Sequence, residues 1–328
     1  MADHKTDDHP DGNYPCGMMP DNTFQTDVLP LLCENPLPVI NWLKQHGLLK
    51  HEMHCQSCHN RMNWTKHSRS KDGFAWKCQT RYCKKYKFTA TIRTGSFFSK
   101  SHVTLQKWVH AIYLWSERVG ERTATRHVNI SEKTMIDCYS FFREVCSKHF
   151  QANPIQLGGL GIIVEIEESC FTQKPKHHRG QAPHTPVPPI SPVWVFSITD
   201  TSTKPTTGYM EVVQSRDAAT LLPIIQAVIQ PGSIIYCDEW RAYCNLQDLS
   251  GDTNKPVNSS INFVDPHCGA HTRTVESYWN RHKSHIKTMR GCKRDFMNSY
   301  LTEFMWHDRY SDNAFENFCK HIALQYPM

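Results

Sequence analysis

The sequence predicts an α/β domain that follows a small cysteine-rich module and a helical region. From residue 158 onward, short apolar runs rich in β-branched residues alternate with amphipathic stretches, which is typical of a mixed sheet with flanking helices. Before that point, apolar residues recur at helical spacing, and two close pairs of cysteines precede them. These observations divide the chain into three parts, each with its own pattern.

Composition is that of a soluble globular protein with two or three domains, because the 328 residues are 39% hydrophobic and 21% charged. The apolar runs are too short for a membrane span, and the polar N-terminus has no signal-peptide pattern. Most of the 14 cysteines are scattered through apolar segments, which favours a reduced, intracellular protein. We therefore expect no membrane partner.

Positive charge is clustered. The net charge is only +6, but 12 Lys/Arg face one acidic residue between Arg61 and Lys107. Between Arg281 and Arg294 there are six Lys/Arg and no acidic residue. Clusters of this kind indicate a polyanionic partner.

The N-terminal third begins with a predicted disordered tail over residues 1–34, most clearly over 1–23, which are rich in Asp, His, Pro and Gly. A short amphipathic helix is expected over 35–44, ending near Gly47. Together with the cysteine pairs this helix makes up the second predicted unit, residues 35–100.

Cys55 and Cys58 form one pair, and Cys78 and Cys83 form the other. Two thiolate pairs on tight turns provide the four ligands of a tetrahedral structural zinc, so we predict a zinc ribbon. Four reduced cysteines without a metal are the less favoured alternative. Lysines alternate with aromatic residues just beyond the last cysteine, at Lys84, Lys85, Tyr86, Lys87 and Phe88. That pattern is typical of phosphate binding, and equally of a solvated strand face.

Residues 101–152 are predicted to be helical. The apolar positions repeat every three or four residues, at Leu105, Trp108, Val109, Ile112 and Val119, and again over 123–128. Ser131 is the expected N-cap of a third helix that begins at Glu132 and runs to about His149. Two helices, a short break and a longer helix outline a helix-turn-helix-like unit that would contact DNA, or alternatively a plain helical packing subdomain.

The last unit, residues 153–328, is predicted to be a ribonuclease-H-like domain. Strands are expected over 161–167, 193–198, 208–213, 233–240 and 261–264. A helix begins at Asp217 and another begins near Thr274, while residues 173–192 form a proline-rich loop. Three strands, a helix, two strands and a helix is the element order of a ribonuclease-H-like domain. Two final helices, over 296–306 and 314–324, are expected to pack against it.

Carboxylates occur where two of these strands end and where the second helix begins, at Glu167, Asp238 and Glu276. If the two strands are neighbours, these oxygens can meet at one edge of the sheet. Hard oxygen ligands select Mg²⁺ or Mn²⁺, and a pair of such ions assists in-line displacement at phosphorus. Any one of the three acids alone is more often a solvated strand or helix end.

Several blocks of the sequence resemble those of the Merlin-type DDE transposases and their bacterial insertion-sequence relatives, the ISXO2-like or IS1595 group. The blocks lie at 164–169, 179–180, 194–196, 216–218, 238–243, 271–279 and 300–306. The resemblance runs from about residue 35 to 310 and includes the cysteine pairs. It implies a ribonuclease-H-like core, two divalent metals at Glu167, Asp238 and Glu276, cleavage at transposon ends by water and strand transfer by the freed 3′-hydroxyl.

The resemblance also implies partners. The N-terminal parts would recognise terminal inverted repeats in double-stranded DNA, the protein would act as a homo-oligomer, and it would be nuclear in a eukaryotic host or cytoplasmic and nucleoid-associated otherwise. The basic residues that we expect to contact DNA are Lys84, Lys85, Lys87, Arg179, Arg281, Lys283 and Lys287.

This chain departs from the family pattern in three places. Glu167 replaces an aspartate, Arg273 replaces a small polar residue, and the loop after residue 173 is longer and richer in proline. We therefore weigh three functions: an active transposase, a transposon-derived DNA-binding protein without the chemistry, and another ribonuclease-H-like nuclease acting on RNA–DNA hybrids. An N-terminal DNA-binding region favours the first two.

Overall fold

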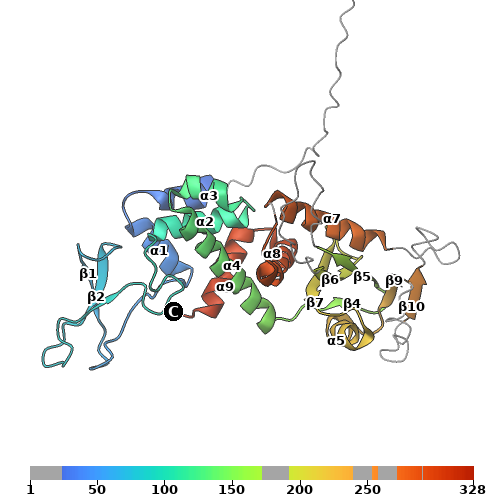
Figure 1. Ribbon diagram of the computed structural model, residues 1–328. Helices are drawn as coiled ribbons and strands as arrows, with labels where there is room; N and C mark the ends of the chain where they lie inside the picture. The colour runs from blue at the N-terminus through green and yellow to red at the C-terminus, as the bar shows by residue number, and fades with distance from the viewer. Residues whose placement is uncertain (1–23, 172–191, 239–252, 258–271, 290) are drawn as a thin grey trace, which may run out of the picture.

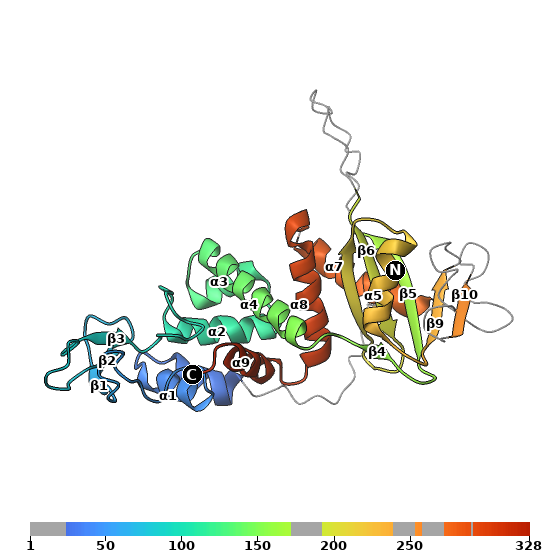
Figure 2. The same ribbon diagram turned by 90° about the horizontal axis from the view of Figure 1, so that it is seen from below.

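A computed structural model describes residues 24–171, 192–238, 253–257, 272–289 and 291–328. It is elongated, with a small sheet at one end, a larger sheet at the other and helices between them (Figures 1 and 2). In the described part of the chain, no helix combines the length and the apolar character needed to cross a membrane.

Residues 24–32 correct the predicted tail. They form two short helical segments, η1 (Phe24–Val28) and η2 (Leu29–Leu32), and Val28 and Leu31 are buried. The prediction of disorder over residues 1–34 was therefore wrong for this part, and residues 1–23 lie outside the described residues. The expected helix after it is α1 (Leu37–Gln45), which ends just before Gly47 in the left-handed conformation (φ 68°).

The small sheet contains β1 (Asn63–Lys66), β2 (Phe74–Lys77) and β3 (Thr89–Thr91) in that order, all antiparallel. Trp64 and Trp76 are paired across β1 and β2 with their rings edge to face, centroids 5.0 Å apart. The Nζ of Lys44 on α1 lies 3.6 Å from the Trp64 ring centroid. This cation–π contact joins the first helix to the sheet.

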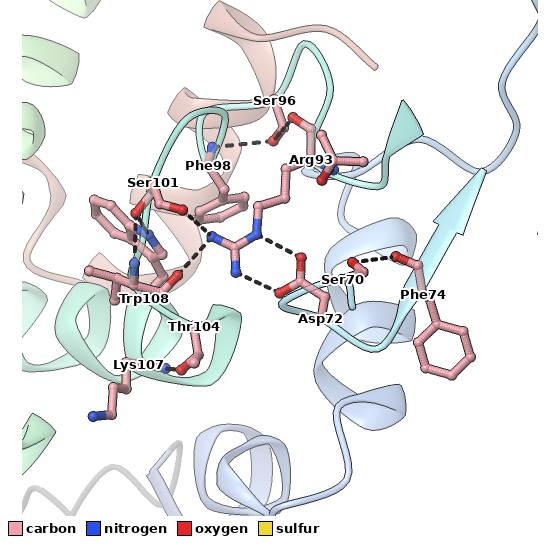
Figure 3. Close-up of polar contacts among 12 residues, drawn as sticks. Ser70, Asp72, Phe74, Arg93, Ser96, Phe98, Ser101, Thr104, Lys107 and Trp108 are labelled. Carbon is pink, nitrogen blue, oxygen red and sulfur yellow. Dashed lines mark hydrogen bonds and ion pairs between the residues drawn. The ribbon is translucent and has the colours of Figure 1, made fainter. Parts of the chain in front are cut away.

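A buried ion pair attaches the small sheet to the helices (Figure 3). Arg93 Nε donates to Asp72 Oδ2 at 2.8 Å, and its Nη1 donates to the carbonyl of Val103 at 2.7 Å. Both side chains are 4% exposed, so the bidentate pair is screened little by water. Because Val103 directly precedes the cap of the next helix, the pair sets the angle at which the chain leaves the small sheet.

The helical region consists of α2 (Leu105–Ser116), α3 (Glu121–Val128) and α4 (Glu132–Ala152). The predicted cap is confirmed, since the Ser131 hydroxyl accepts from the Thr134 N–H at 3.1 Å. The final helix, α9 (Ala314–Gln325), completes this core: the Phe318 ring lies 4.3 Å from that of Trp115. We had assigned α9 to the last domain, but its apolar face packs mainly on α2 and α4.

Four of the five strands of the large sheet correspond to strands that the sequence predicts for a ribonuclease-H-like domain. The strands of this sheet run in the order β10-β9-β5-β6-β7, with bounds β5 Ile163–Cys170, β6 Trp194–Asp200, β7 Thr207–Val213, β9 Ile234–Asp238 and β10 Thr253–Val257. The first three in sequence are antiparallel, and β9 and β10 are parallel to β5. A two-stranded sheet of β4 (Leu157–Gly158) and β8 (Ile229–Gln230) lies beside it.

The fifth strand differs from our prediction. It is β10 (Thr253–Val257), whereas the predicted run over 261–264 lies outside the described residues. Two helices cover opposite faces of the sheet, α5 (Ala218–Val228) and α7 (Arg273–Thr288) (Figures 1 and 2). After η4 (Arg294–Phe296), α8 (Met297–Tyr310) leads back toward the helical region.

Candidate functional site

Four cysteines form a cluster at the end of the small sheet. Their Sγ atoms all lie within 4.8 Å of one another, with 3.8 Å between those of Cys55 and Cys83 and 3.9 Å between those of Cys58 and Cys78. A tetrahedral zinc with Zn–S bonds of about 2.3 Å needs sulfur separations of about 3.8 Å, so the arrangement fits. Backbone hydrogen bonds from Ser57 and Cys58 lower the pKa of the Cys55 thiol to about 6, whereas burial and the neighbouring thiols raise that of Cys78 to about 11, so the fit to zinc depends on the geometry of the four sulfurs.

The predicted carboxylates of the large sheet lie on neighbouring parallel strands. Ile166 of β5 pairs with Cys237 of β9, so Glu167 and Asp238 occupy the next position on each strand. The structure describes Asp238 by its backbone only. The prediction that the two acids meet at one edge of the sheet agrees with this register and stays a prediction.

Helix α7 brings the third acid to the same face of the sheet. Alternate residues of a strand share a face, so the side chains of Glu165, Glu167 and Ser169 lie together. The Val275 N–H in the first turn of α7 donates to Glu165 Oε2 at 2.9 Å. Glu276 is the next residue, and it is half-buried. The helix start is therefore fixed directly above the strand that carries Glu167.

A second bond fixes the direction of α7. Trp279 Nε1 donates to Ser197 Oγ at 2.8 Å, and Ser197 is the β6 partner of Glu167 in the sheet. Glu276 lies between Val275 and Trp279 in sequence, and both of these residues are bonded to the face of the sheet that carries Glu167. Oxygen ligands from two strands and one helix suit a hard divalent cation.

Lys283 lies in the same region. Its ammonium donates to Ser169 Oγ, two residues beyond Glu167 on the same strand. Burial lowers the pKa of Lys283, while the negative charges of Cys170 and Glu167 act in the opposite direction. The site therefore contains a fixed cation beside its carboxylates.

The other predicted DNA-contacting residues are spread over the molecule. Lys84 and Lys87 are exposed beside the cysteine cluster, Lys85 is half-buried, and Lys287 is exposed on α7. Arg281 donates to the Thr206 carbonyl at 2.8 Å. Arg179 lies outside the described residues. Within the described chain the structure thus divides the predicted contacts between the small sheet and α7.

Comparison with known proteins identifies the domain that carries the carboxylates. Residues 156–308 match the ISXO2-like transposase domain. An uncharacterized transposase-like protein of Haemophilus influenzae is 33% identical over 98 residues, which are 30% of this chain and 77% of the relative. The chain belongs to the ISXO2-like transposase family.

Solved structures similar to this transposase are distant. A chain of the simian T-cell lymphotropic virus intasome in complex with PP2A regulatory subunit B56 gamma matches with a TM-score of 0.29 and 12% identity over 60% of this chain and 67% of that chain. The Mos1 strand transfer complex has a TM-score of 0.20 and 11% identity, over 67% of this chain and 78% of that chain. The pre-cleavage Mos1 transpososome has a TM-score of 0.19 and 9% identity, over 67% of this chain and 79% of that chain. Such TM-scores are too low to support a shared arrangement, so the family assignment depends on sequence.

Two features of the chain were missed by sequence reasoning. The first is Glu165, whose hydrogen bond from the Val275 N–H of α7 gives it a structural role. The second is a buried cluster around Asp308 on α8, which lies 3.0 Å from His282 Nε2 and 3.4 Å from Arg281 Nη2. The sequence contains a signal for this cluster, because a histidine on the apolar face of a helix needs a buried partner. His282 lies on such a face of α7, together with Val275, Tyr278, Trp279 and Ile286.

Proposed function

We propose that this transposase cleaves DNA at terminal inverted repeats and joins the freed 3′ end to target DNA. The observation that supports the proposal is that β5 and β9 are neighbouring parallel strands and that the first turn of α7 is bonded to β5, within the part of the chain that matches the family's domain. Glu167, Asp238 and Glu276 would hold two Mg²⁺ or Mn²⁺ ions, and the cysteine cluster would hold one structural zinc.

The donor set agrees with this assignment. The oxygens of carboxylates suit hard divalent ions, and four thiols suit zinc, so the two sites would select different metals. When bound, a pair of divalent ions supplies charge stabilisation to the attacking and leaving oxygens of phosphoryl transfer.

The protein's own residues position this chemistry. The Glu165 carboxylate keeps the start of α7, and with it Glu276, above the strand. The Lys283 ammonium, held by Ser169, provides a positive charge for a phosphate of the bound DNA strand. Trp279 and Ser197 prevent the helix from rotating about its axis. A rigid frame of this kind is needed because a small misplacement of the reacting groups lowers the rate strongly.

Recognition of double-stranded DNA is assigned to the small sheet and the helical region. The cationic residues Lys84, Lys85 and Lys87 support the first, and the order of α2, α3 and α4 supports a helix-turn-helix-like role for the second. The same proposal includes a homo-oligomeric state and a Merlin-type affiliation. It also includes a nuclear location in a eukaryotic host, or a cytoplasmic and nucleoid location otherwise.

A second candidate is a DNA-binding protein that derives from a transposon and has lost the chemistry. Glu167 favours it, because its side chain is longer by one methylene than the aspartate of the family pattern, which would displace a metal ligand by about 1 Å. The frame around the site, including Glu165 and Trp279, is intact in either case.

A cleavage and strand-transfer assay separates the two candidates. The substrate is DNA with the element's terminal repeats, with Mg²⁺ or Mn²⁺, and the proteins are the native chain, Glu167→Asp, Asp238→Ala and Glu276→Gln. We expect activity in the native chain and a loss of at least a hundredfold in Asp238→Ala and Glu276→Gln. Activity that appears only in Glu167→Asp would establish the second candidate, and full activity in Asp238→Ala would refute the metal-site assignment.

A further inference from the structure

The segment around Cys83, residues 81–88, combines exposed aromatic rings with positive charge. Tyr82 is fully exposed, and Tyr86 and Phe88 are 49% and 45% exposed. Four cations accompany them in the same short segment, at Arg81, Lys84, Lys85 and Lys87. We call residues 81–88 the aromatic knuckle. Large exposed rings cost hydration free energy, so their concentration in one segment indicates a surface that is covered when the protein works.

Charge on the aromatic knuckle is not neutralised. In the described part of the chain, no Asp or Glu forms an ion pair with any of the four cations. The sequence contains no acidic residue between Asp72 and Glu117. Lys85 Nζ lies 5.0 Å from the Phe88 ring centroid, and Lys87 Nζ lies 5.3 Å from that of Tyr86. Cations and ring faces are therefore presented side by side.

The knuckle is held in one conformation. Cys78 N–H donates to the Phe88 carbonyl at 2.9 Å, and Lys87 N–H donates to the Cys78 carbonyl at 2.8 Å. Inside the loop, Tyr86 N–H donates to the Cys83 carbonyl at 2.9 Å. Cys78 precedes the knuckle and Cys83 lies within it, and both belong to the cysteine cluster, so a bound metal would anchor the segment. Since the loop is already ordered, binding would cost little conformational entropy.

We propose that the aromatic knuckle binds unpaired bases of a DNA strand, with the lysines on the phosphates and the rings of Tyr82, Tyr86 and Phe88 stacked on bases. Contact with duplex phosphates alone would need the cations but not the rings, because paired bases keep their faces inside the stack. Aromatic rings on a positively charged surface are the arrangement by which proteins hold single strands without sequence preference. The inference rests on the proposed function, and it adds that the protein holds a locally unpaired strand.

The test is fluorescence anisotropy of the full chain loaded with zinc, at one salt concentration. The probes are a labelled single strand of about 12 nucleotides and the duplex of the terminal repeat. We expect Tyr82→Ala and Tyr86→Ala each to weaken single-strand binding by about fivefold or more, and to leave duplex binding within twofold. Tyr82→Phe and Tyr86→Phe keep the ring and should bind like the native chain. Leu324→Ala removes another exposed apolar side chain, 75% exposed, and should change nothing.

The outcomes are distinguishable. Three results would overturn the inference: equal losses of affinity for both probes, no loss of affinity in the alanine variants, or no single-strand binding at all. The inference would also be overturned if heparin displaced the single strand as easily from the alanine variants as from the native chain. Duplex binding that persists in these cases leaves the proposed function standing. Absence of binding to both probes would count against the proposed function itself. Zinc content equal to that of the native chain shows that each variant is folded.

Discussion

Glu165 is a buried carboxylate whose role follows from one contact. It is fully buried, and its Oε2 accepts from the Val275 N–H at the start of α7. The first N–H groups of a helix have no partner within the helix, and the cap residue of α7, Thr272, supplies no side-chain bond. Glu165 therefore satisfies a donor that would otherwise be buried and unbonded, and its charge is favourable beside the positive end of the helix dipole.

Replacement of Glu165 by alanine should destabilise the protein by about 2–3 kcal/mol, because a buried N–H loses its acceptor. Glu165→Gln keeps an acceptor oxygen and should lose less than half as much. The measurement is guanidinium unfolding followed by circular dichroism, with DNA strand transfer as the second readout. Since Glu276 follows Val275, we expect strand transfer to fall with the alanine variant. Equal stability of the alanine and glutamine variants would show that the bond contributes nothing.

His321 gives the helical region a dependence on pH. Trp306 Nε1 donates to its Nδ1 at 2.9 Å, and the His149 ring is stacked on it at 3.7 Å between centroids. Burial, and secondarily the nearby His149, lower the pKa of His321 from 6.5 to about 4. The unfolded chain then binds the proton more readily than the folded one, so stability is present above pH 6.5 and is lost as the pH falls toward 4.

The variant His321→Gln should retain an acceptor for Trp306 and lose the titration. Between pH 7.5 and 5 we expect the native chain to lose roughly 1 kcal/mol more stability than the variant. Urea unfolding at the two pH values measures the difference. An identical loss in both proteins would mean that His321 does not titrate in this range. His46→Gln changes an exposed histidine and is the matched control.

At the scale of elements, the contact between Asp72 and Arg93 fixes the small sheet against α2. The pair is buried, bidentate and extended by bonds from Arg93 to the carbonyls of Ser101 and Val103. A pair of this kind is not itself a large source of stability, but loss of one partner leaves a buried charge without compensation.

We expect Asp72→Ala to lower the free energy of unfolding by about 3–5 kcal/mol. The exposed pair of Arg61 and Glu52, with side chains 69% and 51% exposed, is the control, and Glu52→Ala should cost less than about 0.5 kcal/mol. Thermal unfolding measures both. Arg93→Lys should also be costly, since an ammonium cannot make the forked contact. A cost for Asp72→Ala as small as that of Glu52→Ala would contradict the role given to this pair.

Elements with a local cause could be predicted from the sequence. Ser131 predicts a helix start because its hydroxyl caps the helix directly, and the run before Asp238 predicts a strand because its residues are apolar and β-branched or aromatic. The cysteine cluster follows from spacing alone. Elements that depend on distant partners were missed. Residues 24–32 are partly polar, and they are helical because Val28 and Leu31 pack on the core. Strand β10 contains a proline, and it is a strand because it pairs with β9.

For the candidate site, strand ends and the family blocks predict the three carboxylates Glu167, Asp238 and Glu276, which stay a prediction. The alternation of residues along β5 places Glu165 on the face of Glu167. Sequence could not show that α7 lies on that face, because the bonds of Glu165 and Ser197 to α7 join residues far apart in the chain. The packing of α9 on α2 was missed for the same reason.

In the whole molecule, Asp308 joins the helical region to the large sheet. It lies on α8, and its carboxylate contacts Arg118 after α2 at 3.5 Å and both Arg281 and His282 on α7. Burial alone would raise the pKa of Asp308, but the hydrogen bond from His282 and the charges of the two arginines hold it below its usual value. A carboxylate that stays charged can bind all three groups across the junction of the two parts.

Replacement of Asp308 by alanine should therefore loosen this junction. In this variant His282, which is only 1% exposed, loses its partner, whereas Arg118 and Arg281 can turn to solvent. We therefore expect the free energy of unfolding to fall by about 2–4 kcal/mol. Hydrogen exchange should show α7 losing protection before α2 and α4, because their core does not include the carboxylate. The exposed Asp312→Ala is the control and should match the native chain. If α7 kept its native protection in Asp308→Ala, the junction would depend on apolar packing alone, and the position of Glu276 would not depend on Asp308.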